Sequence, residues 1–498
     1  MAGIGFELQK LVRKGTLSST IQAFLYGSIL SSGPVILTIL TVGIIAWLSY
    51  GIFHIGAINI FTVTIVYTFA FSLILTGAPQ IVFTRYVADQ EFAKRPEQIY
   101  PGLLTSLALV SALALLTAVP FYLILKVTAP VGNVLLYKII AVLTFWGVSL
   151  VWQLMGFIST SKEYQKIVWS YLAGTIVSLV LAYFLVPKIA VAGGLAGFCA
   201  GQWLIAALIF HITTRHLPKK SRWAKEYFGY FRRYPRIALV GLFYNVGIWI
   251  DKFVFWEHFR QAQGASLFFT FNFYDVPNFL AFLTIIPALA YFLILTETNF
   301  YKDYSGFIDD VLSQPLLLIE RKKEDMIATL KEGMKGMVRL QGIVTLLLIV
   351  FAQPFLVFIH YHGVSIWLFR IMLIGVFFHV VNLNINIIFL YYEMRAKALH
   401  MTLLFAGLNF VLTVLSIHLG TPFYGIGFLL ATGITTAISW PLLIQSVRKI
   451  DFLIFASQPL DAVVKTEKKN LWQKLKERIS GVRNRLNGKD KIYPEFIE

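Results

Sequence analysis

Twelve runs of mostly apolar residues, each about 20 residues or longer, occupy the greater part of this sequence. A bilayer core about 30 Å thick is crossed by roughly 20 residues of α-helix, so such runs are long enough to span it. They are too long, and alternate too little, to be the strands of a membrane barrel. The sequence therefore predicts an all-α integral membrane protein. The runs lie at about residues 20–48, 58–83, 102–125, 134–159, 168–187, 190–213, 237–256, 265–297, 340–360, 364–391, 398–418 and 422–447.

The positions of the basic residues predict how the chain is oriented in the membrane. The formal net charge of +18 could by itself suggest a nucleic-acid-binding protein. However, the first loop expected outside, "SYGIFHIGAINI", contains no Lys or Arg, whereas the segment from Arg215 to Arg236 contains eight. Lys and Arg are concentrated in the cytoplasmic loops of membrane proteins. We therefore expect both termini in the cytoplasm and no nucleic-acid partner.

A basic segment, residues 214–236, divides the runs into two sets of six. We predict an N-terminal six-helix lobe, residues 1–213, and a C-terminal six-helix lobe, residues 237–447, related by an axis along the membrane normal. The motifs "GGLAGFCAG" and "YGIGFLLATG" open the sixth and twelfth runs and suggest a repeat, although their small residues also permit close helix packing. A cytoplasmic loop, residues 298–337, and a basic tail, residues 448–498, complete the predicted organisation.

The segments outside the apolar runs lack the motifs of an enzyme. None contains a phosphate-binding glycine loop, a metal-ligand cluster or a nucleophile motif. Asp309 and Asp310 could suggest a glycosyltransferase, but nothing around them could form a nucleotide-sugar-binding fold. The single cysteine, Cys199, excludes an intramolecular disulfide. We expect no catalytic activity of the chain's own, no cofactor and no bound metal.

Two segments predicted to be cytoplasmic carry apolar stripes at helical spacing. One consists of Met326, Leu330, Met334 and Met337. The other lies in the tail, where Leu475 and Ile479 continue a stripe beside Lys and Arg residues and Trp472 stands at its start. Such a helix could lie on the anionic inner leaflet or could dock a cytosolic partner. The second interpretation makes Trp472, Leu475 and Ile479 candidate docking residues.

The seventh run, "NVGIWIDKFVFW", contains two adjacent charges, Asp251 and Lys252. Each could cost several kcal/mol if it faced lipid. Helical neighbours point about 100° apart, so we expect the two charges not to face each other, with Lys252 instead sharing a face with Asn245. In one interpretation these residues line a polar path for a substrate. In the other, Lys252 reaches the outer headgroups and Asp251 pairs with a neighbouring helix.

The eighth run adds further candidates for a polar path. These are Asn272, Asp275 and Asn278, at spacings of three on one helix face. If this helix starts near residue 265, Asp275 lies about 15 Å along it, close to the membrane midplane. An intramembrane carboxylate is a functional candidate, although Lys252 or backbone donors could also satisfy it. The aromatic residues Phe271, Phe273 and Tyr274 could stack on sugar faces or pack in the core.

Two more polar residues in the runs allow alternative interpretations. Arg85, at the inner end of the second run, could anchor that helix at the interface or could lie at a cytoplasmic entrance to the path. His379, in the tenth run, could titrate, but a lone intramembrane histidine is more often a packing residue. The asparagines Asn382, Asn384 and Asn386 of the same run point in different directions and define no single face.

Several motifs, spread over both halves, resemble the membrane subunit of the Pel exopolysaccharide exporter, the PelG family. They are "MAGIGFELQKL", "SSGP", "GAPQIVFTRYVAD", "NVGIWIDKFVFW" and "TETNFYKDY". The family belongs to the multidrug/oligosaccharidyl-lipid/polysaccharide (MOP) flippase superfamily, whose fold is two six-helix lobes around a central cavity. The resemblance implies export of an N-acetylhexosamine polymer across the bacterial inner membrane, for biofilm exopolysaccharide.

The same resemblance implies partners. They are a cytosolic glycosyltransferase that makes the polymer, and accessory inner-membrane subunits that include a cyclic di-GMP receptor. The two-lobed fold could instead serve an ion-coupled exporter of small molecules or a flippase for lipid-linked oligosaccharides. An ion-coupled protein needs a carboxylate that titrates or binds an ion, and Asp251 and Asp275 would qualify. A pore coupled to synthesis could be driven by chain growth alone.

Overall fold

The computed structural model describes residues 36–49, 55–157, 164–219, 223–295, 300–359 and 365–451, and within them the named elements are all helices. Within the described residues, eleven helical segments are long and apolar enough to cross a membrane, one of them the two consecutive short helices between Asn272 and Leu295, and the 14-residue apolar helix Ile36–Ser49 lies within the first predicted run. The all-α membrane fold predicted from the sequence is confirmed. The tail residues Trp472, Leu475 and Ile479 lie outside the described residues.

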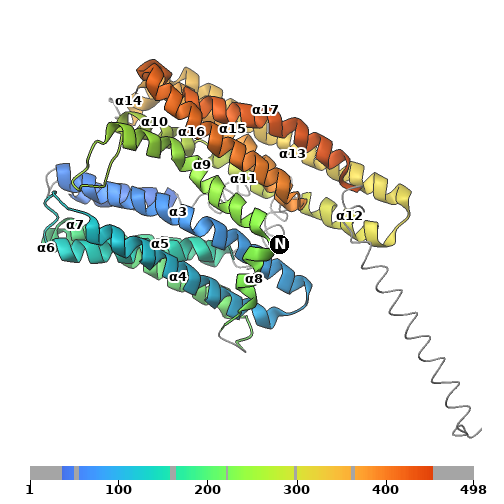
Figure 1. Cartoon of the computed structure of the whole chain (residues 1–498), viewed down its shortest axis with the longest axis horizontal. Helices are drawn as coiled ribbons and strands as arrows, with labels where there is room; N and C mark the ends of the chain where they lie inside the picture. Colours follow the sequence, from blue (N-terminus) through green and yellow to red (C-terminus); the bar gives the residue numbers. More distant parts are fainter. Residues whose placement is uncertain are drawn as a thin grey trace, which may run out of the picture. The chain divides into compact units, whose positions relative to one another are not determined.

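Figure 1 labels the helices in chain order. They are α3 (Ile55–Phe92), α4 (Ile99–Ile124), α5 (Val134–Met155), α6 (Tyr164–Ile189), α7 (Val191–Thr214), α8 (Glu226–Arg233), α9 (Pro235–Phe259), α10 (Asn272–Leu283), α11 (Ile286–Leu295), α12 (Tyr301–Ser313), α13 (Leu316–Val350), α14 (Ala352–Phe358), α15 (Ile366–Tyr391), α16 (Arg395–Leu419) and α17 (Ile426–Arg448). Residues up to Leu443 belong to one compact unit, and Ile444 begins a second, of which only the end of α17 and three further residues are described.

Small residues bring helices of the first half into close contact. In α7, Gly193, Gly197 and Gly201 follow one another at four-residue spacing, and each faces the backbone of α6. A Cβ added at Gly197 would lie 2.6 Å from the backbone nitrogen of Ala182. Such spacing permits close helix approach in membranes. In the second half, a Cβ at Gly427 of α17 would lie 2.7 Å from the carbonyl carbon of Leu412 in α16. Both glycine motifs therefore serve close packing.

The eighth predicted run differs from the structure. Residues 260–271 form a loop with isolated β-bridges, Val127 to Ala265 and Ala262 to Phe269, and α10 begins only at Asn272. The helix ends at Leu283, and α11 begins at Ile286, next to Pro287. Asp275 therefore lies in the first turn of α10, and the expectation that it lies about 15 Å along a helix is wrong.

The predicted cytoplasmic loop 298–337 is largely helical. α12 packs along α13, and Thr329 of α13 donates a 2.6 Å hydrogen bond to Asp303 of α12. The stripe Met326, Leu330, Met334 and Met337 is buried within the protein. It is therefore a packing face, and neither of the two interpretations proposed for it from the sequence applies.

The two halves meet where α3 contacts α9, drawn in blue and green in Figure 1. We call this contact the seam. A Cβ added at Gly77 of α3 would lie 2.9 Å from the carbonyl carbon of Gly241 in α9, so the two backbones touch. Asn245 of α9 donates a 2.8 Å hydrogen bond to the carbonyl oxygen of Leu73 in α3. The absence of side chains at both glycines is what permits this approach.

Candidate functional site

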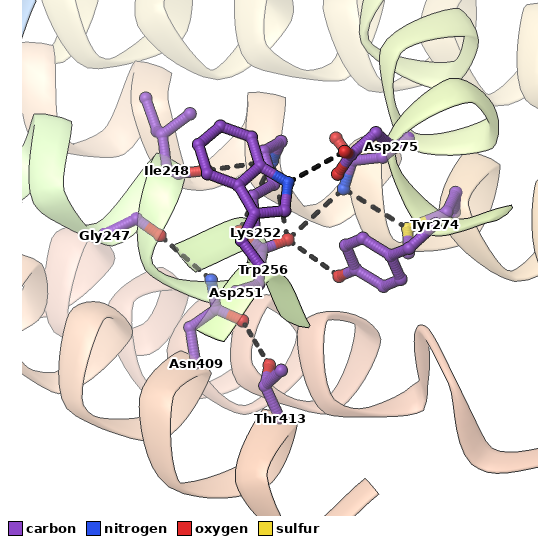
Figure 2. Close-up of polar contacts among 11 residues, drawn as sticks. Gly247, Ile248, Asp251, Lys252, Trp256, Tyr274, Asp275, Asn409 and Thr413 are labelled. Carbon is purple, nitrogen blue, oxygen red and sulfur yellow. Dashed lines mark hydrogen bonds and ion pairs between the residues drawn. The ribbon is translucent and has the colours of Figure 1, made fainter. Parts of the chain in front are cut away.

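Asp251 and Lys252 of α9 form an ion pair with each other (Figure 2). Lys252 Nζ lies 3.3 Å from Asp251 Oδ1 and donates a 3.1 Å hydrogen bond to the carbonyl oxygen of Ile248. Asp251 is fully buried and only 8% of Lys252 is exposed. The expectation that these neighbours do not face each other is wrong, because the flexible four-carbon stem of lysine lets the ammonium turn back. The ammonium is enclosed by the protein.

Two residues of α10 complete the surroundings of Asp251. The Tyr274 hydroxyl donates a 2.7 Å hydrogen bond to Asp251 Oδ2, and Asn278 Nδ2 donates to the same oxygen at 3.3 Å. Lys252 Nζ also lies 5.5 Å from the ring centroid of Trp249 and 5.3 Å from that of Phe282. A buried ion pair needs such additional partners, because desolvation of both charges is costly. We call Asp251, Lys252, Tyr274 and Asn278 the Asp251 cluster.

Asp275 makes different contacts, although it stands beside Tyr274 in the sequence. Its Oδ2 accepts a 2.8 Å hydrogen bond from Trp256 Nε1 (Figure 2) and a 2.9 Å hydrogen bond from the backbone N–H of Phe271. Its Oδ1 is buried and has no hydrogen-bond partner among the described residues, and the same holds for Oδ1 of Asn278, about one turn later. Buried acceptors normally have donors. These two oxygens therefore have acceptor capacity that no described residue uses.

The remaining predicted path residues are not part of this cluster. Asn272 is exposed at the start of α10, so it does not share the buried environment of Asn278. Asn245 lies in the seam, where its amide nitrogen is occupied by carbonyl oxygens of Leu73 and Gly241. Tyr67 of α3 stacks on Trp256, which binds Asp275 beside the cluster. Arg85 lies 18 residues further along the same helix, about 27 Å from Tyr67.

The interior of the second half contains further polar residues on α15. His379 is 2% exposed and its ring contacts those of Tyr244, Phe282 and Phe405. This environment agrees with the packing interpretation of His379. Asn384 and Asn386 are both buried, and Oδ1 of each has no partner in the described part of the chain. The second half thus holds more unpartnered buried amide oxygens than the sequence pattern suggested.

Two contacts of the candidate site were not foreseen from the sequence. Tyr274 was expected to act through its ring, but its hydroxyl contacts Asp251. Trp256 binds Asp275 through its indole N–H. A usable signal exists for both, because a buried Tyr or Trp needs a partner for its polar atom. An acid and these aromatics within two adjacent apolar runs would have been reasonable pairs to test.

Solved structures with the same fold are transporters. A MATE protein in the bent conformation superposes with a TM-score of 0.62 at 13% identity, over 91% of this chain and 99% of that one. An inward-facing structure of a multidrug resistance MATE family transporter of the MOP superfamily gives a TM-score of 0.56 at 13% identity, over 85% of this chain and 98% of that one. An outward-facing structure of such a transporter gives a TM-score of 0.59 at 13% identity, over 86% of this chain and 96% of that one. This likeness shows the fold and does not select one conformation.

Sequence comparison identifies the family. No curated protein matches the sequence. Residues 1–455 match the family described as "PelG: Putative exopolysaccharide Exporter (EPS-E)". The match covers both halves and the whole of the Asp251 cluster, in agreement with the resemblance noted from the sequence. The chain is therefore a multi-pass membrane protein that belongs to the PelG exopolysaccharide exporter family and has the fold of the MOP transporters.

Proposed function

We propose that the chain moves a growing, N-acetylhexosamine-rich polysaccharide across the bacterial inner membrane, with both termini in the cytoplasm. The observation that carries this proposal is the pair of buried, unpartnered acceptors, Asp275 Oδ1 and Asn278 Oδ1. Sugar hydroxyls and amide N–H groups would lose several kcal/mol each if they stayed unpaired in a dry passage. Acceptors inside the protein reduce this loss. Membership of an exopolysaccharide exporter family supports the choice of substrate.

The polymer would be delivered by a cytosolic glycosyltransferase, with accessory inner-membrane subunits that include a cyclic di-GMP receptor. The basis for these partners is the family resemblance. The tail residues Trp472, Leu475 and Ile479 remain the proposed docking helix. The orientation rests on the basic segment 214–236, which we place in the cytoplasm.

Polymer synthesis in sealed vesicles tests the proposal. The chain would be copurified with its glycosyltransferase, reconstituted, and supplied with nucleotide sugar, and polymer protected inside the vesicles would be measured per folded protein. Asn278→Val should reduce protected polymer severalfold, because the acceptor is lost while most of the volume is kept. The donor to Asp251 is lost with it, and counting polymer per folded protein corrects for any loss of stability. Thr117→Val is the control, since within the described part of the chain that hydroxyl bonds only carbonyls of its own helix. Full export by Asn278→Val would contradict the proposed role.

An ion-coupled exporter is the second candidate, and one observation favours it. The cluster and its neighbour contain two carboxylates, Asp251 and Asp275, but the described contacts include only one buried ammonium, that of Lys252. The excess negative charge could be neutralised by a proton or a monovalent cation. Asp275→Asn separates the candidates, because an amide can still accept a hydrogen bond but cannot titrate. Partial export favours the polymer path, and near-complete loss favours ion coupling.

A further inference from the structure

Five residues from both halves meet at one end of the seam, next to α8. We call them the charged junction. They are Arg85 and Asp89 of α3, Tyr234 before α9, and Glu393 and Arg395 at the turn between α15 and α16. This end of the seam is referred to as the linker end.

The contacts of the charged junction join the two halves. Arg85 forms ion pairs with Asp89, at 2.9 Å, and with Glu393, which also pairs with Arg395. The Tyr234 hydroxyl donates a 2.9 Å hydrogen bond to Asp89. The guanidinium of Arg85 lies 5.2 Å from the centroid of the Tyr234 ring, and the guanidinium of Arg395 lies 4.5 Å from the same centroid. One aromatic ring therefore contacts a cation from each half, within the range of a cation–π interaction.

The backbone of Glu393 is strained in a way that serves this contact. Its φ angle is +58°, in the left-handed region, which residues other than Gly rarely adopt. The turn is closed by a 2.8 Å hydrogen bond from the N–H of Met394 to the carbonyl oxygen of Phe389. Glycine would fit the turn without strain but would supply no carboxylate. A residue with a strained backbone whose side chain makes the contact between two halves is a candidate for a functional role.

The opposite end of the seam is joined by different contacts. The ring of Tyr67 stacks on Trp256, with centroids 4.9 Å apart, and its hydroxyl donates to the carbonyl oxygen of Phe269 at 3.0 Å and accepts from the N–H of Phe269 at 2.8 Å. We call Tyr67, Trp256 and Phe269 the aromatic junction. Nearby, the loop 260–271 is joined to the first half by backbone hydrogen bonds to Gly264. These contacts are made by aromatic rings, a hydroxyl and backbone groups, and not by ion pairs.

We propose that the charged junction is a releasable contact that separates before the aromatic junction, so that the linker end is the first to open during transport. The Arg85 side chain is 26% exposed and that of Glu393 is 45% exposed. Water can hydrate both groups when they part, and salt screens their attraction. Separation of the aromatic junction would expose large rings and leave the paired backbone groups of Phe269 without their partner. This inference does not depend on which molecule is transported.

Distances between spin labels on the full chain in lipid nanodiscs test the proposal. The background is Cys199→Ser, since that buried thiol is the only native cysteine. Labels at Ala88 and His400 report the linker end, and labels at Leu135 and His258 report the opposite end. All four positions are exposed. Raising salt from about 0.05 to about 0.5 M shortens the screening length from more than 10 Å to less than 8 Å.

The expected result is a separation confined to the linker end. Glu393→Gln, and independently Arg85→Gln, should increase the population of long Ala88–His400 distances about twofold to fivefold, which corresponds to an exposed ion pair. Added salt should have a similar effect when the junction residues are unchanged, so this measurement does not depend on whether a junction variant folds. Glu257→Gln is the control, because its pair with Arg260 lies on one helix end and does not join the halves. Unchanged linker-end distances, or earlier separation at the opposite end, would overturn the proposal.

Discussion

Two ion pairs of this protein have similar chemistry but very different surroundings. The pair Asp251–Lys252 lies inside the second half, where the side chains are 0% and 10% exposed. The pair Arg85–Glu393 joins the two halves, where the side chains are 26% and 45% exposed. Removal of one partner from a buried pair leaves an unpaired charge in a medium of low dielectric constant. Removal of one partner from an exposed pair leaves a charge that water can hydrate.

Because the two pairs differ in burial, they suit different roles. The buried pair is surrounded by Tyr274, Asn278 and the rings beside Lys252, so it can fix the packing of α9 against α10. The exposed pair can form and break at little cost, which suits a contact between parts that move. A charge in a membrane protein therefore has to be interpreted from its burial before a role in transport is assigned. The following predictions test this contrast, from the largest expected effect to the smallest.

Asp251→Asn should destabilise the protein by about 3–5 kcal/mol, because Lys252 stays buried without its ion-pair partner. Thermal unfolding in detergent, followed by fluorescence, measures this loss as a lower Tm. The double variant Asp251→Asn/Lys252→Met should recover most of the loss, since neither charge of the buried pair then remains. A Tm equal to that of the parent for the single variant would show that the buried pair is not structural.

Gly241→Ala should cost about 1–3 kcal/mol, because the added methyl group would collide with the backbone of Gly77 across the seam. The same unfolding measurement applies. Gly407→Ala is the matched control, since no atom of the described residues, apart from the nearby backbone of its own helix, lies within 4 Å of a Cβ added at Gly407. Equal Tm values for the two variants would mean that the close approach of α3 and α9 does not contribute to stability.

Hydropathy predicted the positions of most helices but not where α10 and α13 begin. Hydropathy located the membrane-spanning helices because burial in lipid demands long apolar runs. It misplaced the start of α10 because the apolar residues of loop 260–271, such as Phe269, are used in the aromatic junction and not in a helix. It also missed that α13 begins at Leu316, because the charged first part of that helix packs on α12 and is stabilised by tertiary contacts.

For the candidate site, the sequence indicated the charges but not their partners. Asp251 and Lys252 were conspicuous because charges are rare within apolar runs. Tyr274 contacts Asp251 from another helix, and Glu393, which contacts Arg85, lies 308 positions later in the sequence. Neither contact leaves a periodic pattern in a single sequence. The flexible stem of Lys252 further defeated an argument based only on helix geometry.

Tyr67→Phe should have a moderate effect, about 1 kcal/mol, because it keeps the ring on Trp256 and removes only the hydroxyl bonds to Phe269. Hydrogen bonds between membrane helices are worth about 0.6 kcal/mol on average. The Tm and the Leu135–His258 spin-label distance measure the result. Tyr183→Phe is the control, since Tyr183 is 62% exposed. If Tyr67→Phe and Tyr183→Phe gave the same Tm and the same Leu135–His258 distance, the Tyr67 hydroxyl would not be one of the contacts that hold this end closed.

Arg85→Gln should have the smallest effect on stability, at most about 1 kcal/mol at low salt and close to zero at about 0.5 M salt. Its guanidinium is partly exposed, and Asp89 keeps the Tyr234 hydroxyl as a donor after the substitution. The Tm at the two salt concentrations measures the effect. Arg260→Gln is the control for the loss of an exposed arginine, because among the described residues Arg260 forms an ion pair only with Glu257, at the end of the same helix. If Arg85→Gln instead lowered the Tm as much as Asp251→Asn at both salt concentrations, the charged junction would be a fixed structural contact, and water access would not distinguish the two ion pairs.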